Sequence, residues 1–268
     1  MSTAITQSQE WVSPTHLDLP HTDDKPVESS YQPFQAMLLT SCLTPVLDRL
    51  YPDSDYFVGA DTGIYWRLTK PPERGCRAPD WFYVGNVPRL LDGILRKSYV
   101  LWQESVAPPV VVEFVSGDGT EERDATPYDG KFWVYERAIK APYYAIWYPI
   151  EERLEVFELR GTKYRPLPAD SNGRFRIPPL EVDFGIWEGE YLGNPGPWLR
   201  VWDSSGQLLP TAEETNAREK QRADMEKQRA EAEKQRAEAE KQRANAEKQR
   251  ADALASKLRE FGVDPDRI

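Results

Sequence analysis

The chain has 268 residues, of which 40% are hydrophobic and 12% aromatic, and its formal net charge is -10. This composition suffices for a sizeable core, but no apolar run approaches the roughly 20 residues that a membrane span needs, and no secretory signal opens the chain. The first 210 residues hold 20 basic and 30 acidic side chains, whereas the remainder is balanced at 14 and 14. The acidic excess counts against a strongly basic nucleic-acid footprint, and it is compatible with a carboxylate-lined metal site or a local basic groove.

The N-terminal residues 1–27 are rich in Ser, Thr, Pro and Asp and predict an extended arm. Both histidines, His16 and His21, lie in this arm, where solvated side chains are more common than a metal-binding pair. The only cysteines, Cys42 and Cys76, stand in no metal or redox motif. Two isolated thiols without a secretory signal favour a cytoplasmic location.

We expect one folded domain over residues 28–210. It begins with a helix over 31–50, where apolar residues recur at helical spacing, and Pro45 predicts a kink or a split in this helix. Glu28 lies at or just before the helix start. It either complements the helix dipole or serves as an accessory acid of a catalytic site.

Short β-branched and aromatic segments, separated by turns rich in Pro and Gly, predict the next strands. These segments cover residues 55–60, 63–69, 81–84 and 98–104. Asp80 directly precedes the aromatic strand that begins at Trp81. An aspartate after a proline is also a common turn residue, so this position alone is not diagnostic.

The segment 110–115 is the most apolar predicted strand, and it carries one carboxylate, Glu113. Alternation of side chains along a strand places Glu113 on the same face as Val111 and Val115. A charged group in a buried strand is costly unless it is paired or binds a metal ion. Glu113 is therefore satisfied by a basic residue, or lies on a hydrated face, or belongs to a functional site.

A helix over 127–139 and a second buried strand over 141–148 follow. The order strand, helix, strand predicts that the two strands are parallel neighbours. Lys131 and Tyr135 stand four residues apart, on one face of the predicted helix. The remaining predicted elements are a hairpin of 153–159 with 163–167, an extended segment 175–187 that closes the sheet, and a small hairpin of 198–202 with 207–209.

Residues 211–261 contain a near-exact seven-residue repeat of the type Glu-Lys-Gln-Arg-Ala-Glu-Ala. Heptads are typical of a coiled coil, but alanines such as Ala230 and Ala232 lie about 200° apart around a helix and form no continuous seam. Alanine and charge pairs favour a long, charged, solvated helix that associates weakly with itself or with a protein partner. Gly262 ends the helix, and residues 262–268 form a tail.

Asp80, Glu113 and Lys131 fall on a strand start, on the next core strand and on the following helix. Two carboxylates on neighbouring strands can share a hard divalent cation such as Mg²⁺. Such an ion polarises a phosphodiester and lowers the pKa of an attacking water. A nearby lysine can orient that water or balance the developing negative charge.

Four motifs strengthen this interpretation: Pro79-Asp80, Val112-Glu113-Phe114-Val115-Ser116, Lys131-x-x-x-Tyr135 and Tyr143-Tyr144-Ala-Ile-Trp-Tyr-Pro149. With them, residues 19–189 resemble a bacterial restriction endonuclease family of the PD-(D/E)XK phosphodiesterase superfamily. The resemblance implies a restriction-endonuclease-like α/β (α+β) fold, with a mixed sheet and flanking helices. It also implies a Mg²⁺- or Mn²⁺-dependent endonuclease acting on DNA, with Asp80 and Glu113 as metal ligands and Lys131 as a catalytic residue.

The sequence departs from the superfamily pattern at three points. Val115 occupies the position of the usual lysine, whose role the resemblance assigns to Lys131, and Gly130 replaces an acid that usually precedes that lysine. The 33 residues from Asp80 to Glu113 require an inserted turn or hairpin. Two functions therefore stay open: an active endonuclease, or an inactive nuclease-like module that binds nucleic acid or protein. Nucleases that cut both DNA strands often form homodimers, so the first alternative is compatible with a homodimer.

Overall fold

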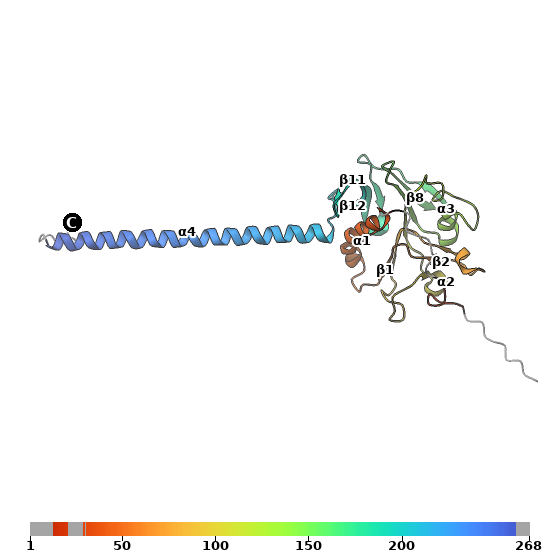
Figure 1. The fold of residues 1–268 in the computed structure, drawn as a ribbon, viewed down its shortest axis with the longest axis horizontal. Helices are drawn as coiled ribbons and strands as arrows, with labels where there is room; N and C mark the ends of the chain where they lie inside the picture. Colours follow the sequence, from red (N-terminus) through yellow and green to blue (C-terminus); the bar gives the residue numbers. More distant parts are fainter. Residues whose placement is uncertain (1–12, 21–28, 30, 261–268) are drawn as a thin grey trace, which may run out of the picture. The chain divides into compact units, whose positions relative to one another are not determined.

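A computed structural model describes residues 13–20, 29 and 31–260 of the chain. It divides the chain into two compact units, Met1–Thr211 and Ala212–Ile268. Every strand among the described residues lies in the first unit, and the second contains the helix α4 (Ala212–Glu260) (Figure 1). Two residues that the sequence analysis singled out, Glu28 and His21, lie outside the described residues.

The centre of the first unit is a six-stranded mixed sheet with the strand order β1-β4-β6-β7-β8-β9. Its strands are β1 (Tyr56–Gly59), β4 (Trp81–Gly85), β6 (Val110–Phe114), β7 (Tyr143–Tyr148), β8 (Arg153–Arg160) and β9 (Lys163–Pro166). β6 and β7 are parallel neighbours, while β4 pairs antiparallel with β6 and β8 pairs antiparallel with β9. The predicted parallel pair, the predicted hairpin and the predicted fold class are thus confirmed.

Two three-stranded sheets and several short helices complete this unit. The sheets consist of β10 (Phe175–Ile177), β11 (Val182–Tyr191) and β12 (Asn194–Trp202), and of β2 (Ile64–Tyr65), β3 (Cys76–Arg77) and β5 (Tyr99–Val100). The short helices are η1 (Pro72–Gly75), α2 (Leu101–Glu104), α3 (Lys131–Trp133), the π-helix η2 (Val134–Ile139) and η3 (Pro178–Leu180).

The end of the domain differs from the sequence-based prediction. β11 and β12 pair along their whole length in a sheet of their own, rather than closing the main sheet, and 207–209 contributes only a bridge between Leu208 and Trp202. Leu192 and Gly193 connect the two strands, both at positive φ, as a two-residue hairpin turn requires. Leucine is not a typical residue for such a turn, so the sequence did not indicate this long hairpin.

Helix α1 (Tyr31–Leu50) forms as predicted and runs without interruption past Pro45. Of the predicted kink or split at Pro45, the split is therefore wrong, and the kink stays a prediction. The helix buries a complete apolar face, including Leu39 and Leu43, against the sheets. This burial compensates for the backbone hydrogen bond that a proline removes from a helix. The helix and the sheet β10-β11-β12 contribute to the apolar cluster on one face of the main sheet.

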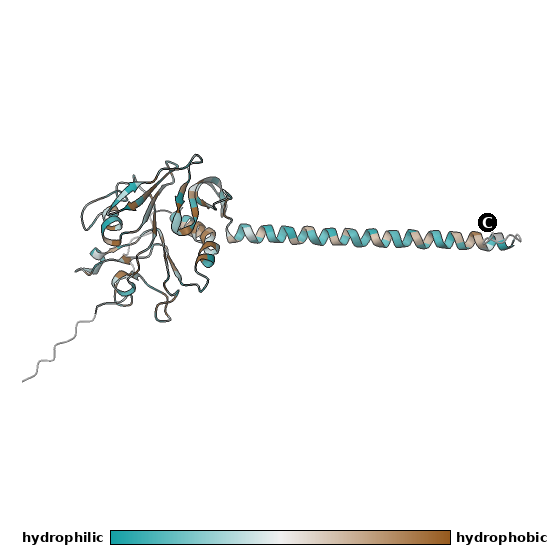
Figure 2. Ribbon diagram, turned by 180° about the vertical axis from the view of Figure 1, so that it is seen from behind, coloured by the Kyte–Doolittle hydropathy of each residue, from teal (hydrophilic) through white to brown (hydrophobic). Residues whose placement is uncertain are grey.

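Strand β6 contributes to the core on both of its faces. Val110, Val112 and Phe114 belong to the cluster beneath α1, and Val111 and Val115 belong to a second cluster that includes side chains of α3 and η2. The predicted alternation is confirmed. Hydrophobic residues accordingly mark the inner strands in Figure 2, whereas α4 is largely hydrophilic.

The side chain of Gln35 joins α1 to β12. Its amide donates to the carbonyl of Leu199 and accepts from the amide of Leu199, each at 2.9 Å, in a buried position. The Gln35→Ala variant leaves both backbone groups without these partners and is expected to lose about 2 kcal/mol of unfolding free energy. Urea denaturation measures the loss, with the exposed Met37→Ala on the same helix as control. A Gln35→Ala midpoint equal to that of the control would contradict this role.

The long interval between Asp80 and Glu113 contains the predicted turn, bridged between Leu91 and Ile94, and also β5 and α2. The predicted strand 98–104 is only partly right, because it becomes helical after Val100. Residues 13–20 lie against this insertion, and His16, expected to be solvated, is buried and accepts a hydrogen bond from the amide of Lys97. These contacts are long-range, and neither local propensity nor composition predicts them.

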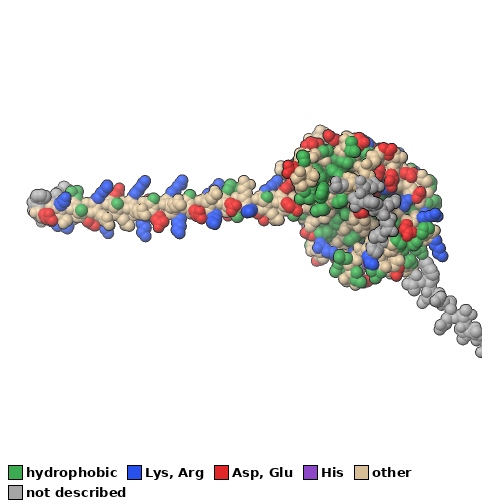
Figure 3. Space-filling model, viewed as in Figure 1, with side chains coloured by type: hydrophobic (Ala, Val, Ile, Leu, Met, Phe, Trp, Pro, Cys, Tyr) green, Lys and Arg blue, Asp and Glu red, His purple; other side chains and the backbone are tan. Residues whose placement is uncertain are grey.

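Helix α4 spans 49 residues, and almost all of its side chains are exposed. Lys, Arg, Asp and Glu side chains follow one another along its whole length (Figure 3). Of the helices in the described part of the chain, none is long and apolar enough to span a membrane.

Candidate active site

The pairing of β4 with β6 brings Asp80 and Glu113 together. Trp81 lies opposite Val112, so Asp80, one residue before Trp81, is level with Glu113, one residue after Val112. The Oδ2 atom of Asp80 accepts a hydrogen bond from the amide of Phe114 at 2.5 Å. The negative charge of Glu113 also acts on this carboxyl group. Two acids that lie 33 residues apart in the sequence are therefore direct neighbours.

Glu113 is 1% exposed and is held by two side chains from the helix that follows β6. Its Oε1 accepts a hydrogen bond from the hydroxyl of Tyr135 at 2.5 Å, and its Oε2 lies 3.2 Å from the Nζ of Lys131. The spacing of four residues puts both donors on one side of the α3 and η2 segment. The buried carboxylate is thus satisfied, and its partners are those that the sequence placed on one helix face.

The helix begins at Lys131, four residues later than predicted from Pro127. The carbonyl of Asp124 folds back over the helix start and accepts hydrogen bonds from the amides of Phe132 and Trp133. A Cβ atom at Gly130 would lie 2.1 Å from that carbonyl oxygen, so only glycine fits. This close approach explains why no acid precedes Lys131.

Lys131 also contacts two acids that the sequence analysis did not select. Its Nζ lies 3.1 Å from Glu122 Oε1 and 3.7 Å from Glu121 Oε1. Glu122 is buried, and the hydroxyl of Tyr144 on β7 donates to its carbonyl at 2.9 Å. The acidic composition of this turn was the only sequence signal for the role of Glu122. The signal was weak, because acids in turns are usually solvated.

Negative charge exceeds positive charge at this site. Burial opposes the charged form of Lys131, but the carboxylates of Glu113 and Glu122 raise its pKa, so it stays an ammonium. Burial, followed by the negative charge of Glu113, raises the pKa of Asp80 to about 8. Burial and Glu113 also raise the pKa of Tyr135, which therefore remains a neutral donor. Glu113 has two side-chain donors and Asp80 one amide, so Asp80 is the acid that carries the proton near neutral pH.

The raised pKa of Asp80 predicts how stability varies with pH. Between its ordinary pKa near 3.8 and about 8, the folded state binds a proton that the unfolded state releases, so stability falls as pH rises through this window. The Asp80→Asn variant lacks this titration. As the pH rises from about 6 to about 8 in the absence of metal, the unfolding free energy of this variant is expected to gain about 2 kcal/mol relative to that of the unsubstituted chain. Urea denaturation at both pH values tests this, with the exposed Glu151→Gln as control. Parallel pH profiles for Asp80→Asn and the unsubstituted chain would contradict it.

The donor set of the site fits a hard divalent cation. Mg²⁺ is commonly bound by one or two carboxylates, with waters and substrate phosphates completing its octahedron. Asp80 and Glu113 supply two such groups, and a bound cation would favour their ionised forms over the proton that Asp80 otherwise carries. No group of three or more His, Cys, Asp or Glu suited to a metal occurs among the described residues, so any such ion would take its other ligands from water or substrate.

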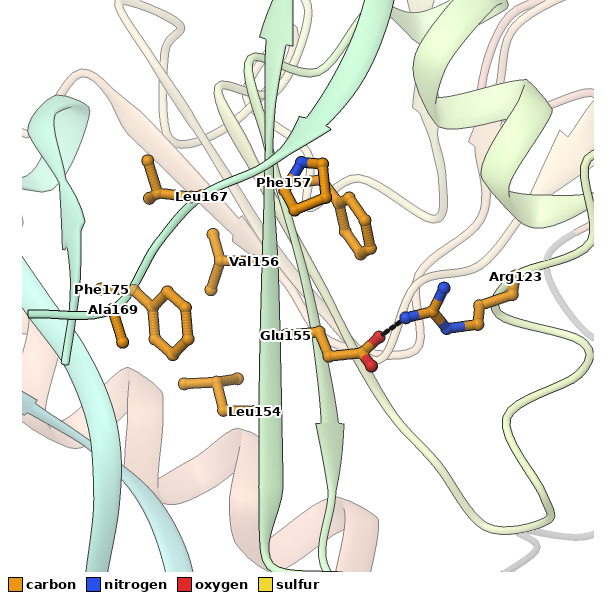
Figure 4. A pocket seen from close by; sticks show the side chains of 9 residues that line it. Arg123, Leu154, Glu155, Val156, Phe157, Leu167, Ala169 and Phe175 are labelled. Atoms are coloured by element: carbon orange, nitrogen blue, oxygen red, sulfur yellow. Dashed lines mark hydrogen bonds and ion pairs between the residues drawn. The ribbon is translucent and has the colours of Figure 1, made fainter. Parts of the chain in front are cut away.

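A separate hollow of about 330 Å³ lies along β8 and contains none of the three predicted site residues. Arg123 and Glu155 form an ion pair on one side of it, and Leu154, Val156 and Phe175 line the other (Figure 4). β9 pairs with β8 only from Phe157 onward. The hollow is thus a feature of the sheet edge and not of the acidic site.

A comparison with protein families identifies the relationship of this chain. Residues 27–192 match the family model described as "Uma2: Putative restriction endonuclease". The chain belongs to the Uma2 family. The predicted resemblance is thereby confirmed, and the Uma2 match includes Asp80, Glu113 and Lys131 but ends before α4. No individual curated protein matches the chain significantly.

Proposed function

We propose that this Uma2 protein is a divalent-metal-dependent endonuclease that hydrolyses phosphodiester bonds in DNA. The observation that carries the proposal is the pairing of β4 with β6, which puts the acids Asp80 and Glu113 level with one another in a buried sheet, beside the ammonium of Lys131. Paired acids with perturbed pKa values, next to a fixed cation, are typical of functional sites. The family description supports nuclease chemistry.

In this proposal Asp80 and Glu113 hold Mg²⁺ or Mn²⁺, as the chemistry of their oxygens favours. When bound, the ion polarises the phosphodiester and lowers the pKa of the attacking water. Lys131 balances the charge that develops on the phosphate or orients the water. Tyr135 holds Glu113 in place through its hydroxyl.

The position of Val115 supports the assignment of the charge-stabilising role to Lys131. Val115 is buried in the apolar cluster on the face of β6 that also carries Glu113. A lysine there would place its stem in that cluster. Lys131 reaches the same carboxylate from the helix, so one cation serves the site from a different element.

The test is cleavage of plasmid DNA and of a circular single-stranded DNA by the full chain with Mg²⁺, with Mn²⁺ and with a chelator, together with calorimetric titration of the metal. Nicked or linear DNA that forms only with a divalent ion supports the proposal. Neither cleavage nor metal binding would leave the alternative, an inactive nuclease-like module that binds nucleic acid or protein. That alternative draws on the acidic balance of the first 210 residues and on Val115.

A further inference from the structure

Four side chains form an aromatic–arginine cluster next to the helix that carries Lys131: Trp66, Arg67, Tyr128 and Trp133. The guanidinium carbon of Arg67 lies 4.3 Å from the ring centroid of Trp66 and 5.2 Å from that of Tyr128. The ring of Trp133 lies 4.6 Å from that of Tyr128 and 6.1 Å from that of Trp66. Trp66 and Arg67 directly follow β2, Tyr128 lies in the turn before α3, and Trp133 belongs to α3.

Tyr128 combines backbone strain with exposure. Its φ is 66°, a left-handed conformation that is a genuine outlier for a bulky residue. Two arginines fix this backbone, since Arg67 donates to the carbonyl of Tyr128 at 3.1 Å and Arg77 donates to the carbonyl of Asp129 at 2.9 Å. The side chain is nevertheless 57% exposed, so core packing does not account for the ring. An exposed aromatic ring on a strained backbone that hydrogen bonds hold in place is suited to binding a ligand.

The cluster lies within reach of the proposed active site. Lys131 follows Tyr128 by three positions, and three positions of extended chain span at most about 11 Å. Aromatic rings and guanidinium planes bind nucleic-acid bases by stacking. In a continuous duplex the base faces are covered by their neighbours, whereas an unpaired base offers its face freely.

The overall charge of the chain favours the same kind of ligand. The first 210 residues carry an acidic excess, which counts against a broad basic surface for phosphate contacts. Stacking gains affinity without a large basic surface. We propose that the aromatic–arginine cluster stacks an unpaired base beside Lys131, and that the substrates of the site are single-stranded or branched nucleic acids rather than continuous duplex. This inference rests on the proposed nuclease function.

The test measures binding apart from cleavage. The full chain carrying Glu113→Gln, without added metal, is titrated into labelled oligonucleotides of one sequence as single strand, as blunt duplex and as duplex with a single-stranded flap. A 2-aminopurine base reports stacking by loss of its fluorescence. We expect the single strand and the flap to bind about tenfold tighter than the duplex, with quenching. The dependence of their affinity on salt should be shallow.

Tyr128→Gly provides a variant that need not destabilise the protein, because glycine adopts positive φ without strain. It is expected to weaken single-strand binding about tenfold while the melting temperature stays unchanged or rises. Tyr128→Phe keeps the ring and should bind within about twofold of the parent. The exposed Ile150→Ala, in the turn before β8, is the remote control.

Equal affinity for duplex and single strand, unaltered binding by Tyr128→Gly, or no binding to any of the oligonucleotides would overturn the inference. The outcome is separable from that of the proposed function. If binding depends on Tyr128 but Mg²⁺ gives no cleavage, the stacking surface stands and the nuclease fails. If duplex plasmid is cut equally well by the parent and by Tyr128→Gly, the nuclease stands and the stacking surface fails.

Discussion

Replacing Asp80 by Asn or Glu113 by Gln is expected to reduce Mg²⁺-dependent cleavage of DNA by at least about 100-fold. Loss of residues that merely orient metal ligands commonly costs 10- to 100-fold, and removal of a ligand costs more. Both substitutions keep the size of the side chain, and Asp80→Asn retains a side-chain oxygen that can accept the hydrogen bond from the amide of Phe114. The cleavage assay on plasmid and single-stranded circular DNA, with calorimetry of Mg²⁺ binding, measures both losses.

The control for these variants is Glu151→Gln, which removes one negative charge from an exposed turn and should leave cleavage unchanged. Circular dichroism verifies that each variant is folded. If Asp80→Asn or Glu113→Gln cut DNA at the rate of Glu151→Gln, the two acids would not be the metal ligands. If a variant still binds the metal but no longer cleaves DNA, the replaced acid is needed for the chemical step and not for holding the ion.

Replacing Lys131 by Met is expected to lower the free energy of unfolding by about 3 kcal/mol near pH 8. The substitution keeps a long apolar stem but removes the cation that lies within 4 Å of Glu113, Glu121 and Glu122. Buried carboxylates then lack their shared counter-charge. The loss should be smaller near pH 5, because Asp80, whose pKa is raised to about 8, is protonated and uncharged there.

Urea denaturation at both pH values measures this effect, and added Mg²⁺ should restore part of the stability near pH 8 because it replaces the missing positive charge. Lys131→Arg is the matched control, since it keeps the charge. Equal stability of Lys131→Met and the unsubstituted chain near pH 8 would show that the ammonium does not hold the acids together.

The sequence predicts the part of the site that follows from local periodicity. The two-residue period of β6 correctly separates Glu113 from the valines beneath α1, and the spacing of Lys131 and Tyr135 correctly puts them on one side of a helix. The parallel pair of β6 with β7 follows from the intervening helix. Such features depend on a few consecutive residues and can be read without knowledge of the rest of the fold.

Features that depend on distant segments could not be predicted in the same way. The helix start at Lys131 is fixed by the carbonyl of Asp124, and the contact of Lys131 with Glu122 follows from that turn. The burial of His16 depends on the insertion between β4 and β6, some 80 residues later in the chain. The composition of residues 1–27 predicted an extended arm. Composition carries no information on contacts with distant segments of the chain, so it could not predict the burial of His16.

Helix α4 has a consequence for how this protein can diversify. Its heptads are nearly identical and bury almost nothing, so each repeat is energetically independent of its position. Deleting or duplicating one repeat shortens or lengthens the rod by about 10.5 Å and requires no compensating change elsewhere. A change in the number of repeats would therefore alter the length of α4 in fixed increments without changing the sequence of the sheet that carries the acids.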